Sequence, residues 1–346
     1  MNWGGPEFCV LAVGAVAVAA ALTLAMRKFA LSRGLLDVPN ARSSHQLPTP
    51  RGGGVAIVAT AMIAFSVLAA LHWIEFNVFA ALAGGVAVAW VGFQDDRHAL
   101  PAAVRLAAHV AAALWALAWL GGLPALRFGD QVVTFSWGGV ILGVLGIVWV
   151  LNLFNFMDGI DGIAASEAVF VVWCGALLTG AQGALSGPGA AAVIFGAACL
   201  GFLYWNWPPA RIFMGDVGSG YVGYVVAVLA LAAGRDNSIA VAVWLTLGGL
   251  FFADATVTLV RRFLRRERLH EAHRSHAYQW LSRKWGSHRR VTMAAIALNV
   301  FWLLPCAWLE TLFPRFAAVI AVTALAVVAV VVLGCGAGRS EQASGG

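Results

Sequence analysis

Apolar runs about as long as a membrane-spanning helix recur along the whole sequence. The chain is 61% hydrophobic and only 11% charged, whereas soluble domains carry roughly 25% charged residues. A helix needs about 20 apolar residues to cross the ~30 Å hydrocarbon core of a bilayer. We therefore expect an all-α, polytopic integral membrane protein with about eleven transmembrane helices. The expected spans lie near residues 8–26, 55–73, 77–93, 102–120, 139–156, 163–180, 189–207, 217–234, 239–260, 291–309 and 316–334.

The polar segments between these runs are short, so we expect one transmembrane domain over residues 1–335. The longest of them, residues 261–290, is too short to build a core of its own. No small-residue cleavage site follows the first span, and Arg27 and Lys28 come after it, so it is expected to stay in the mature protein. Residues 336–346 are small and polar and are expected to form a disordered tail.

Lysine and arginine are distributed unevenly between the two sides that this layout predicts. All but three of the 22 Lys and Arg fall on one side, and only Arg127, Arg235 and Arg315 fall on the other. Because cytoplasmic loops carry the excess of Lys and Arg, we expect the N-terminus outside and the C-terminus in the cytoplasm. The net charge of +6 is thus a sign of topology, and no nucleic acid is expected as a partner.

Polar islands interrupt the apolar sequence, and one of them follows residue 151. Asn152, Asn155 and Asp158 recur at every third position at the end of an apolar span, which spreads them over roughly 120° of one helix face. The glycines that follow predict that the helix breaks near Gly159, which would bring Asp158 and Asp161 around one pocket. The alternative is a polar helix end with a glycine cap, which would need neither two amides nor two acids.

Carboxylates also mark the ends of two other spans. Asp95 and Asp96 end the third span, and adjacent helical residues point about 100° apart, so they are expected to play different parts. Asp216 lies among glycines just before a span, where backbone N–H groups can approach a phosphate and a metal can be held beside it. The alternatives are a solvated helix end for the pair and a simple capping acid for Asp216.

The ninth span and the basic segment after it add further candidates. Asp254 lies within the span, and an ionisable residue at that depth is a functional candidate, with a helix–helix hydrogen bond as the alternative. The segment 261–290 holds His273, Arg274 and His276 among many other cations, a composition that suits diphosphate recognition. A basic loop attracted to anionic lipid is the alternative for this segment.

The donor atoms in these islands are carboxylates and amides, with no thiolate among them. Such a set suits a hard cation that keeps some of its water, which is Mg²⁺ or Mn²⁺. A metal of this kind neutralises a diphosphate during phosphoryl transfer. A site at the membrane margin predicts one lipid substrate and one water-soluble cytosolic substrate. The isolated His109 is expected to be an interfacial or core residue.

These motifs carry a resemblance to a known family. They are Pro48-Thr-Pro-Arg51-Gly-Gly-Gly54, Asp95-Asp96, Asn152-x2-Asn155-x2-Asp158-Gly-x-Asp161-Gly162, Phe213-Met-Gly-Asp216-x-Gly-Ser219 and the basic His loop. In this order they resemble the polyprenyl-phosphate N-acetylhexosamine-1-phosphate transferases, glycosyltransferase family 4, along nearly the whole chain. The resemblance implies transfer of a sugar 1-phosphate from a UDP-sugar to undecaprenyl phosphate, with release of UMP. It also implies a single transferase domain in the bacterial inner membrane, with a periplasmic N-terminus and an active site facing the cytoplasm.

The same resemblance implies roles for individual residues. Asp216 matches the principal Mg²⁺ ligand and Asp95 the catalytic base toward the lipid phosphate. Asp96 matches a catalytic residue and second metal ligand, beside the lipid head group. The pocket around the nucleotide and diphosphate matches Asn152, Asn155 and the catalytic Asp158. Further contacts to substrate are expected from Arg51, Asp161, Asp254, His273, Arg274 and His276. The family reaction has been read as direct attack by the lipid phosphate or as a covalent enzyme phosphate. We expect direct attack, because a lipid phosphate is mostly ionised at neutral pH.

The His loop departs from the muramoyl-pentapeptide branch of the family, which has consecutive histidines. The form His273-Arg-Ser-His276-Ala-Tyr-Gln279 resembles the branch that starts O-antigen and related glycan chains. Donors in that branch are UDP-GlcNAc or 6-deoxy amino sugars such as UDP-FucNAc and UDP-QuiNAc. The alternatives are phospho-N-acetylmuramoyl-pentapeptide transfer in peptidoglycan synthesis and, from another class, a metal-dependent membrane transporter. A homodimer is compatible with the sequence.

Overall fold

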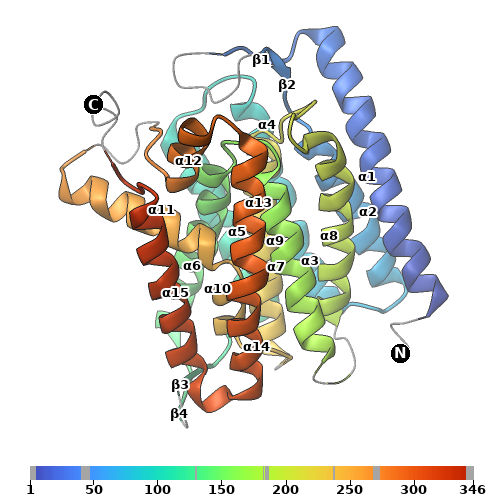
Figure 1. The fold of residues 1–346 in the computed structure, drawn as a ribbon. Coiled ribbons are helices and arrows are strands. Elements are labelled where there is room, and N and C mark those ends of the chain that lie inside the picture. The colour runs from blue at the N-terminus through green and yellow to red at the C-terminus, as the bar shows by residue number, and fades with distance from the viewer. Residues whose placement is uncertain are drawn as a thin grey trace.

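The computed structural model describes residues 5–39, 47–128, 131–181, 183, 187–236, 238–267 and 273–339. Almost all of this part of the chain is helical (Figure 1). Helix α1 (Pro6–Arg33) begins at one end of the bundle and α15 (Ala317–Gly334) finishes at the opposite end (Figure 1). The all-α, polytopic fold predicted from the sequence is confirmed. We refer to the end that carries β1, β2 and α12 in Figure 1 as the upper end.

The helices follow the apolar runs, and turns fall where polar residues and glycines interrupt them. The remaining helices are α2 (Gly54–Ala70), α3 (Phe76–Ala83), α4 (Gly85–Asp95), α5 (Ala102–Leu120), α6 (Trp137–Met157), α7 (Ile163–Gly180), α8 (Gly187–Asn206), α9 (Asp216–Arg235), α10 (Val241–Leu247), α11 (Gly249–Leu264), α12 (Ala277–Trp285), α13 (His288–Leu298) and α14 (Leu304–Leu312). A π-helical turn, η1 (Asn299–Leu303), joins α13 to α14, and a 3₁₀ turn, η2 (Pro314–Phe316), precedes α15.

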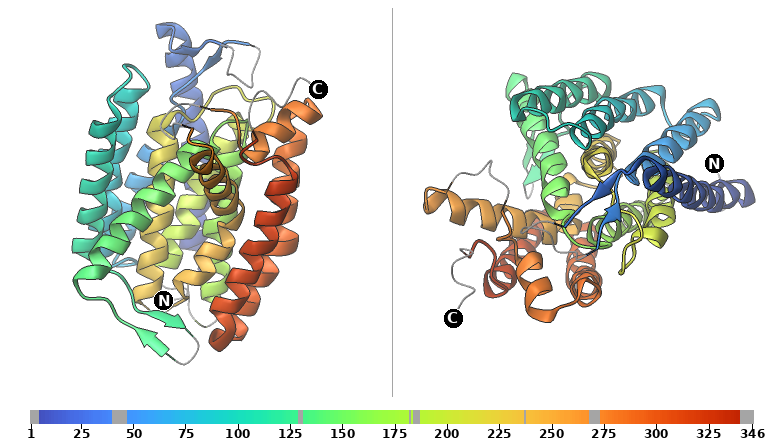
Figure 2. Two further views of the ribbon diagram at one scale, coloured as in Figure 1. Left: turned by 90° about the vertical axis from the view of Figure 1, so that its left-hand side faces the viewer. Right: turned by 90° about the horizontal axis from the view of Figure 1, so that it is seen from above.

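Two short antiparallel pairs of strands complete the fold. β1 (Leu36–Asp37) pairs with β2 (Thr49–Pro50) at the upper end, with Leu36 opposite Pro50. β3 (Leu126–Phe128) pairs with β4 (Gln131–Val133) in the connection between α5 and α6, at the lower end (Figures 1 and 2).

Every predicted span overlaps a helix. Nine helical segments of the described residues are long and apolar enough to cross a membrane, and the bent pair α10–α11 makes up to ten. The remaining predicted span, near residues 55–73, corresponds to α2, which is apolar but only 17 residues long. The expected count of about eleven is thus reached only when the bent pair is counted as one span and the shorter α2 is included.

Helix α9 forms the centre of the bundle. Nearly all of its side chains are buried, and it contacts α2, α4, α6 and α8 among others (Figure 2, right). Its first residue, Asp216, lies where α9 and α4 approach most closely. A Cβ added at Gly92 of α4 would lie 2.3 Å from the Asp216 carbonyl oxygen, so only glycine allows this crossing. Packing at the core therefore positions the start of α9.

Helices α10 and α11 form a sharply bent pair. Their axes differ by 75° across a break at Gly248 and Gly249, and α11 runs sideways near the upper end (Figure 1). The segment that follows α11 leads to α12, which lies over the upper end of the bundle (Figure 1). The break thus brings the predicted His loop toward the end of α6.

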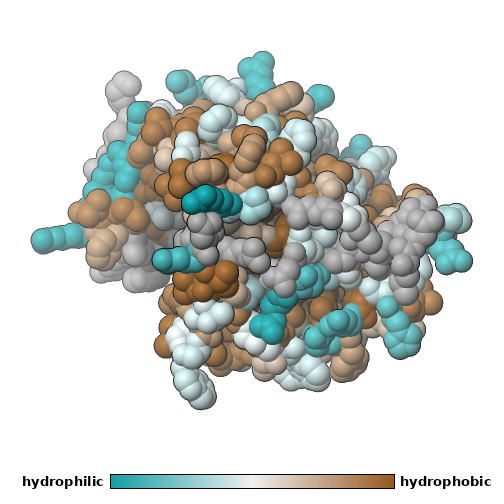
Figure 3. All heavy atoms as spheres, turned by 90° about the horizontal axis from the view of Figure 1, so that it is seen from below, coloured by the Kyte–Doolittle hydropathy of each residue, from teal (hydrophilic) through white to brown (hydrophobic). Residues whose placement is uncertain are grey.

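The polar segments gather at the upper end. The loops after α4, α6 and α8 and the start of α12 all lie there, as the alternating helix directions require (Figure 1). Seen from below, the lower end shows hydrophilic groups scattered among hydrophobic ones (Figure 3). Among the described Lys and Arg, those at the lower end are Arg127, Arg235 and Arg315, the three that the charge pattern predicted there.

Candidate active site

The site is built around the first turn of α9. Asp216 is the first residue of this helix, and Asp96 accepts hydrogen bonds from the backbone N–H of Asp216 (2.9 Å) and of Val217 (3.2 Å). Gly215 has φ +76°, and a Cβ there would lie 2.6 Å from a carboxylate oxygen of Asp96. The Gly-Asp motif thus lets the Asp96 carboxylate reach the helix N-terminus, where negative charge is favoured.

The glycine-rich loop before α2 places the cationic side chain of Arg51 next to the Asp96 carboxylate. Arg51 forms an ion pair with Asp96. Backbone hydrogen bonds fix the loop: Gly53 N–H donates to the Phe213 carbonyl (2.9 Å) and Gly54 N–H to that of Met214 (2.9 Å). Burial raises the pKa of Asp96 above its ordinary value, and the charge of Arg51 opposes that rise. Asp96 therefore serves in this structure as the cap of α9 and the partner of Arg51.

Asn155 links α6 to the same turn. Its Nδ2 donates to Asp216 Oδ1 (3.1 Å) and to Ser219 Oγ (3.0 Å). The carboxyl groups of Asp95 and Asp216 lie within hydrogen-bonding reach of one another. Asn155 and Asp95, which come from two different polar islands of the sequence, thus meet at the carboxylate of Asp216.

Asp95 is held from the side of α5. Its Oδ2 accepts from Arg105 Nη1 (2.6 Å), and its Oδ1 accepts from the Leu100 N–H (2.6 Å). Asp95 and Asp96 therefore have different partners, as their divergent directions on a helix predict.

Asp158 caps the C-terminus of α6, where the helix ends as predicted near Gly159. Removal from water raises the pKa of Asp158 well above its ordinary value, and the negative charges of Asp216 and Asp96 raise it further. Several acids thus crowd one small region with Arg51 as a nearby cation. Such crowding favours an added cation, because opposite charge stabilises the ionised carboxylates.

A cavity of about 460 Å³ opens beside these acids. The predicted site residues that line it are Asp95, Asn152, Asn155, Asp216, His273 and His276. It continues between α4, α5 and α6 along apolar side chains such as Val88, Leu106 and Leu151. The cavity therefore has a polar end at the acids and an apolar extension toward the bundle. A larger cavity of about 650 Å³ lies at the lower end and is lined by none of the predicted residues.

Sequence reasoning missed two cavity residues on α5. Arg105 lies ten positions after Asp95 and holds its carboxylate. His109 lies one helical turn further along the same face and also lines the cavity, although it was expected to be an interfacial or core residue. Its Nδ1 is buried and has no hydrogen-bond partner among the described residues. The four-residue spacing of two polar side chains on an apolar helix was the signal that could have identified them.

The His segment forms another wall of the cavity. Asp254 of α11 accepts from the N–H groups of Ala277 (2.9 Å) and Tyr278 (3.2 Å), so this buried carboxylate caps α12. His276 Nδ1 lies 3.4 Å from the same carboxylate. Asp254 was predicted to contact substrate, and in the structure it orders the segment that carries His273 and His276.

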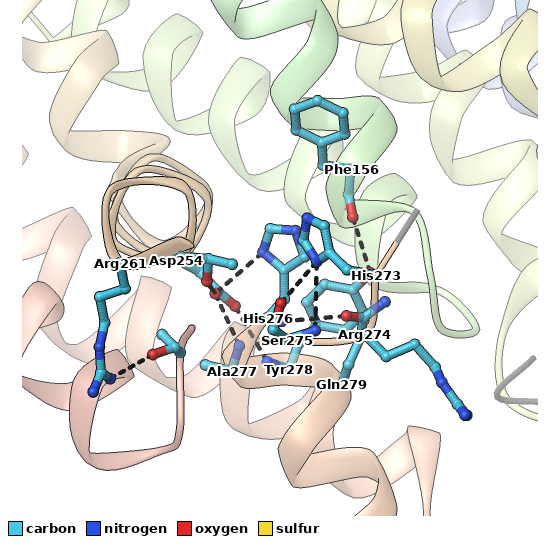
Figure 4. Close-up of polar contacts among 12 residues, drawn as sticks. Phe156, Asp254, Arg261, His273, Arg274, Ser275, His276, Ala277, Tyr278 and Gln279 are labelled. Carbon is cyan, nitrogen blue, oxygen red and sulfur yellow. Dashed lines mark hydrogen bonds and ion pairs between the residues drawn. The ribbon is translucent and has the colours of Figure 1, made fainter. Parts of the chain in front are cut away.

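His273 is held by its neighbour Ser275. Its Nδ1 lies 2.9 Å from Ser275 Oγ, and the rings of His273 and His276 have centroids 5.0 Å apart (Figure 4). Burial, together with the charges of His276 and Arg262, lowers the pKa of His273 to about 3. The imidazole is therefore neutral at physiological pH, and its Nε2–H would be available as a donor when Nδ1 accepts from Ser275.

Other predicted residues have partners away from the cavity. Asp161 lies 3.1 Å from His288 Nδ1 and accepts from the Ala210 N–H (3.0 Å), so it joins the loop after α6 to α13 and to the loop before α9. Arg274 is not among the residues that line the cavity, and its carbonyl accepts from Arg283 (3.0 Å). Asn152 lines the cavity while its Nδ2 donates to the Val148 carbonyl (2.7 Å).

The donor set fits a metal that is shared with a substrate. Among the described residues, no three His, Cys, Asp or Glu side chains form a ready-made metal cage. Mg²⁺ usually binds through one or two protein carboxylates and fills its other positions with water and substrate phosphates. The crowded carboxylates at the start of α9 suit that mode better than a closed cage.

The region that holds Asp95, Asp96, Asp158 and Asp216 is similar to a known protein family. Residues 78–234 match the family described as "Glycosyl transferase family 4". A probable undecaprenyl-phosphate N-acetylglucosaminyl 1-phosphate transferase of Bacillus subtilis is 28% identical over 279 residues, 78% of this chain and 75% of that protein. A decaprenyl-phosphate N-acetylglucosaminephosphotransferase of Mycobacterium tuberculosis is 25% identical over 317 residues, 83% of this chain and 78% of that protein.

A third relative is similar over a short stretch. The phospho-N-acetylmuramoyl-pentapeptide-transferase of Mycolicibacterium vanbaalenii is 45% identical over 64 residues, 18% of this chain and 16% of that protein. The family match and these relatives confirm the prediction of a sugar-phosphate transferase enzyme, and they support the assignment of this chain to glycosyl transferase family 4.

Proposed function

We propose that this protein transfers an N-acetylhexosamine 1-phosphate from a UDP-sugar to undecaprenyl phosphate, releasing UMP. The observation that carries the proposal is the cavity beside Asp95 and Asp216, which joins an acidic, amide-lined end to an apolar extension between helices. A diphosphate and a lipid phosphate could meet at such a junction. The names of the B. subtilis and M. tuberculosis relatives supply the substrate classes.

We propose that Asp216 is the principal Mg²⁺ ligand. Its carboxylate is adjacent to that of Asp95 and accepts from Asn155. Asp96, the second ligand expected from the sequence, would have to share oxygens that already accept from Arg51 and from α9. When bound, the metal would neutralise the charge of the donor diphosphate. Mn²⁺ has the same preference for oxygen ligands and is the proposed substitute.

The chain's own residues would orient the two phosphates. Arg105 lies where the polar end meets the apolar extension, so we propose that it binds the lipid phosphate while Asp95 holds its guanidinium in place. Asn155, His273 and His276 line the cavity nearby and would contact the donor. Asp158 lies near Asp216 and Asp96, whose charges act on it, and we propose that it acts beside them. A neutral His273 can donate a hydrogen bond to a phosphate oxygen without adding charge.

The proposed reaction is a direct displacement. An oxygen of the lipid phosphate attacks the phosphorus that bears the sugar, and the bond from that phosphorus to the bridging oxygen breaks. The bridging oxygen leaves with UMP, and the product is an undecaprenyl diphosphate-linked sugar. Both Asp95 oxygens already accept hydrogen bonds, from Leu100 and Arg105, which favours an orienting role over a covalent one.

We propose that the upper end faces the cytoplasm of a bacterial inner membrane. The support is the charge distribution, because all described Lys and Arg except Arg127, Arg235 and Arg315 lie toward the upper end. A water-soluble UDP-sugar would then reach the site from the compartment in which nucleotides are found. The sugar that the donor carries is proposed to be GlcNAc or a 6-deoxy amino sugar, for O-antigen or a related envelope glycan. The support is the resemblance of the His segment to the branch that starts such glycans.

The test is an assay of the purified protein with undecaprenyl phosphate, Mg²⁺ and a panel of UDP-sugars. The panel contains UDP-GlcNAc, UDP-FucNAc, UDP-QuiNAc and UDP-MurNAc-pentapeptide, and UMP and lipid-linked sugar are both measured. We expect UMP release that requires the lipid phosphate. Turnover with the pentapeptide donor alone would favour the peptidoglycan alternative, and no UMP with any donor would refute the proposed function. The mass of the purified protein distinguishes a monomer from the homodimer that the sequence allows.

A further inference from the structure

The residues after α15 fold back onto the His segment. We call residues 336–339 the strap. Gly336 and Gly338 have φ of +101° and +66°, and Ala337 is fully buried, with its N–H donating to the Val332 carbonyl (2.9 Å). The tail predicted from residue 336 onward therefore begins with an ordered turn, and residues 340–346 lie outside the described part of the chain.

Two arginines of α11 anchor the strap. Arg261 Nη1 donates to the Ala337 carbonyl (2.6 Å; Figure 4), and Arg265 Nη1 donates to the Gly338 carbonyl (2.5 Å). The two arginines are four residues apart and so share a face of α11. A further cation, Arg339, lies over the Trp280 ring of α12, 5.5 Å from its centroid. The strap thus joins the ends of α11 and α15 to α12.

The geometry of the strap requires glycine at two positions. A Cβ at Gly338 would lie 2.8 Å from the Arg261 side chain, and one at Gly336 would lie 3.0 Å from the Trp280 ring. Both residues also have positive φ, which disfavours any other residue type. The sequence therefore has glycine at both positions where the backbone conformation and the close contacts of the strap require it.

A short chain of hydrogen bonds leads from the strap to the cavity. Gly338 N–H donates to the Ser275 carbonyl (2.7 Å). The hydroxyl of the same Ser275 lies 2.9 Å from His273 Nδ1, and Arg262 Nη1 lies 3.4 Å from that hydroxyl. His273 lines the cavity. Ser275 is 3% exposed, so its position is fixed by these contacts rather than by water.

We propose that the strap is a positioning element that holds Ser275, and through it His273, in the orientation that binds the donor diphosphate. This inference rests on the proposed function, since it takes His273 to contact the donor. Loss of the strap would let Ser275 move, and the His273 Nε2–H would no longer be aimed. The expected consequence is weaker binding of the UDP-sugar with little change in binding of the lipid phosphate.

Two truncated proteins test the strap directly. One ends at Cys335 and lacks it, and the other ends at Arg339 and keeps it. Loss of one or two hydrogen bonds predicts a rise of about tenfold in donor KM for the protein ending at Cys335. The protein ending at Arg339 should match the full chain. The KM for undecaprenyl phosphate should stay within about twofold in both, because none of residues 336–339 lines the cavity.

Point variants guard against a truncation that fails to fold. Arg261→Ala removes one anchor of the strap and should raise the KM for the UDP-sugar. Arg261→Lys keeps a hydrogen-bond donor at this position and should raise that KM less. Lys28→Ala removes an exposed cation of α1 at the same end of the bundle and should leave both KM values unchanged. Hydrogen exchange of the free protein should be faster at residues 275–278 in the truncated form and unchanged in α9.

The outcomes separate this proposal from the proposed function. If the full chain releases no UMP, the proposed function fails and the exchange experiment still reports whether the strap orders Ser275. If the full chain is active but donor KM is unchanged in both the Cys335 truncation and Arg261→Ala, the strap proposal is overturned. An equal rise in donor and acceptor KM would also overturn it, because that pattern indicates a general loss of structure.

Discussion

Asn155 Nδ2 donates to Asp216 Oδ1 at 3.1 Å, which joins the end of α6 to the start of α9 across 61 residues of sequence. The same amide nitrogen donates to Ser219 Oγ, so Asn155 spans the first turn of α9. This contact leaves the carboxylate of Asp216 oriented toward Asp95 and the cavity. The orientation matters because it is the carboxylate to which we assign the metal.

Asp216→Asn should reduce UMP release by about 10³-fold or more, because it removes the charge of the principal proposed metal ligand while keeping the side-chain size. The matched control is Ser219→Ala, which removes only the second partner of Asn155 and should retain activity within about tenfold. Both variants should insert normally and elute as the unmodified protein does. Turnover of Asp216→Asn near that of the unmodified protein would remove Asp216 from the metal site.

Arg105→Ala should raise the KM for undecaprenyl phosphate by about tenfold or more, since a charge-assisted hydrogen bond to phosphate is worth roughly 1.5–3 kcal/mol. Arg105→Lys should be intermediate, because it keeps the charge but not the planar fork. Initial rates are measured with one substrate varied at a time. A rise in donor KM of the same size would place Arg105 at the diphosphate instead.

Asp254→Ala should destabilise the His segment, because it leaves the N–H groups of Ala277 and Tyr278 without their buried acceptor. Loss of a helix cap costs about 0.5–2 kcal/mol, which we expect as a lower midpoint of thermal denaturation together with a lower kcat/KM for the donor. Asp254→Asn keeps an acceptor oxygen and should lose less on both measures. An unchanged midpoint with an abolished kcat would instead point to the direct substrate contact predicted from the sequence.

His273 should contribute to the acid sensitivity of the fold. Its pKa is lowered to about 3 in the folded protein, against about 6.5 in an unfolded chain. Between these values the unfolded state binds more protons, so this residue makes the fold less stable as the pH falls from about 6.5 toward 3. His273→Gln should therefore lose less of its denaturation midpoint between pH 7 and pH 5 than the unmodified protein does. An identical loss in both would show that His273 does not titrate differently on folding.

Much of the fold could be predicted because span length and composition are local properties. The run near residues 163–180 is apolar except for Ser166, Glu167 and Thr179, and α7 follows it residue for residue. The gathering of acids at one end also follows from local information, since successive spans must alternate in direction. The break of α6 before Gly159 was visible in the glycines that follow Asp158.

The contacts of individual acids could not be predicted, because they join residues that are distant in sequence. Asp96 caps α9 across 120 residues, and Asp161 meets His288 across 127. Neither partner leaves any mark in the spacing around the acid itself. The 75° bend between α10 and α11 was likewise invisible, since its glycines resemble those that pack other helices. Asp254 was singled out correctly as unusual, but its backbone partners appear only in three dimensions.

The close crossing of α4 and α9 at Gly92 makes activity sensitive to a substitution outside the polar residues of the site. Residue 92 carries no chemistry, yet a methyl group there would push the backbone of Asp216 away from its partners. Gly92→Ala would therefore lower the turnover number, although residue 92 has no side chain to contact the nucleotide or the lipid. Catalytic competence in this chain thus depends on a close interhelical contact that involves no catalytic side chain.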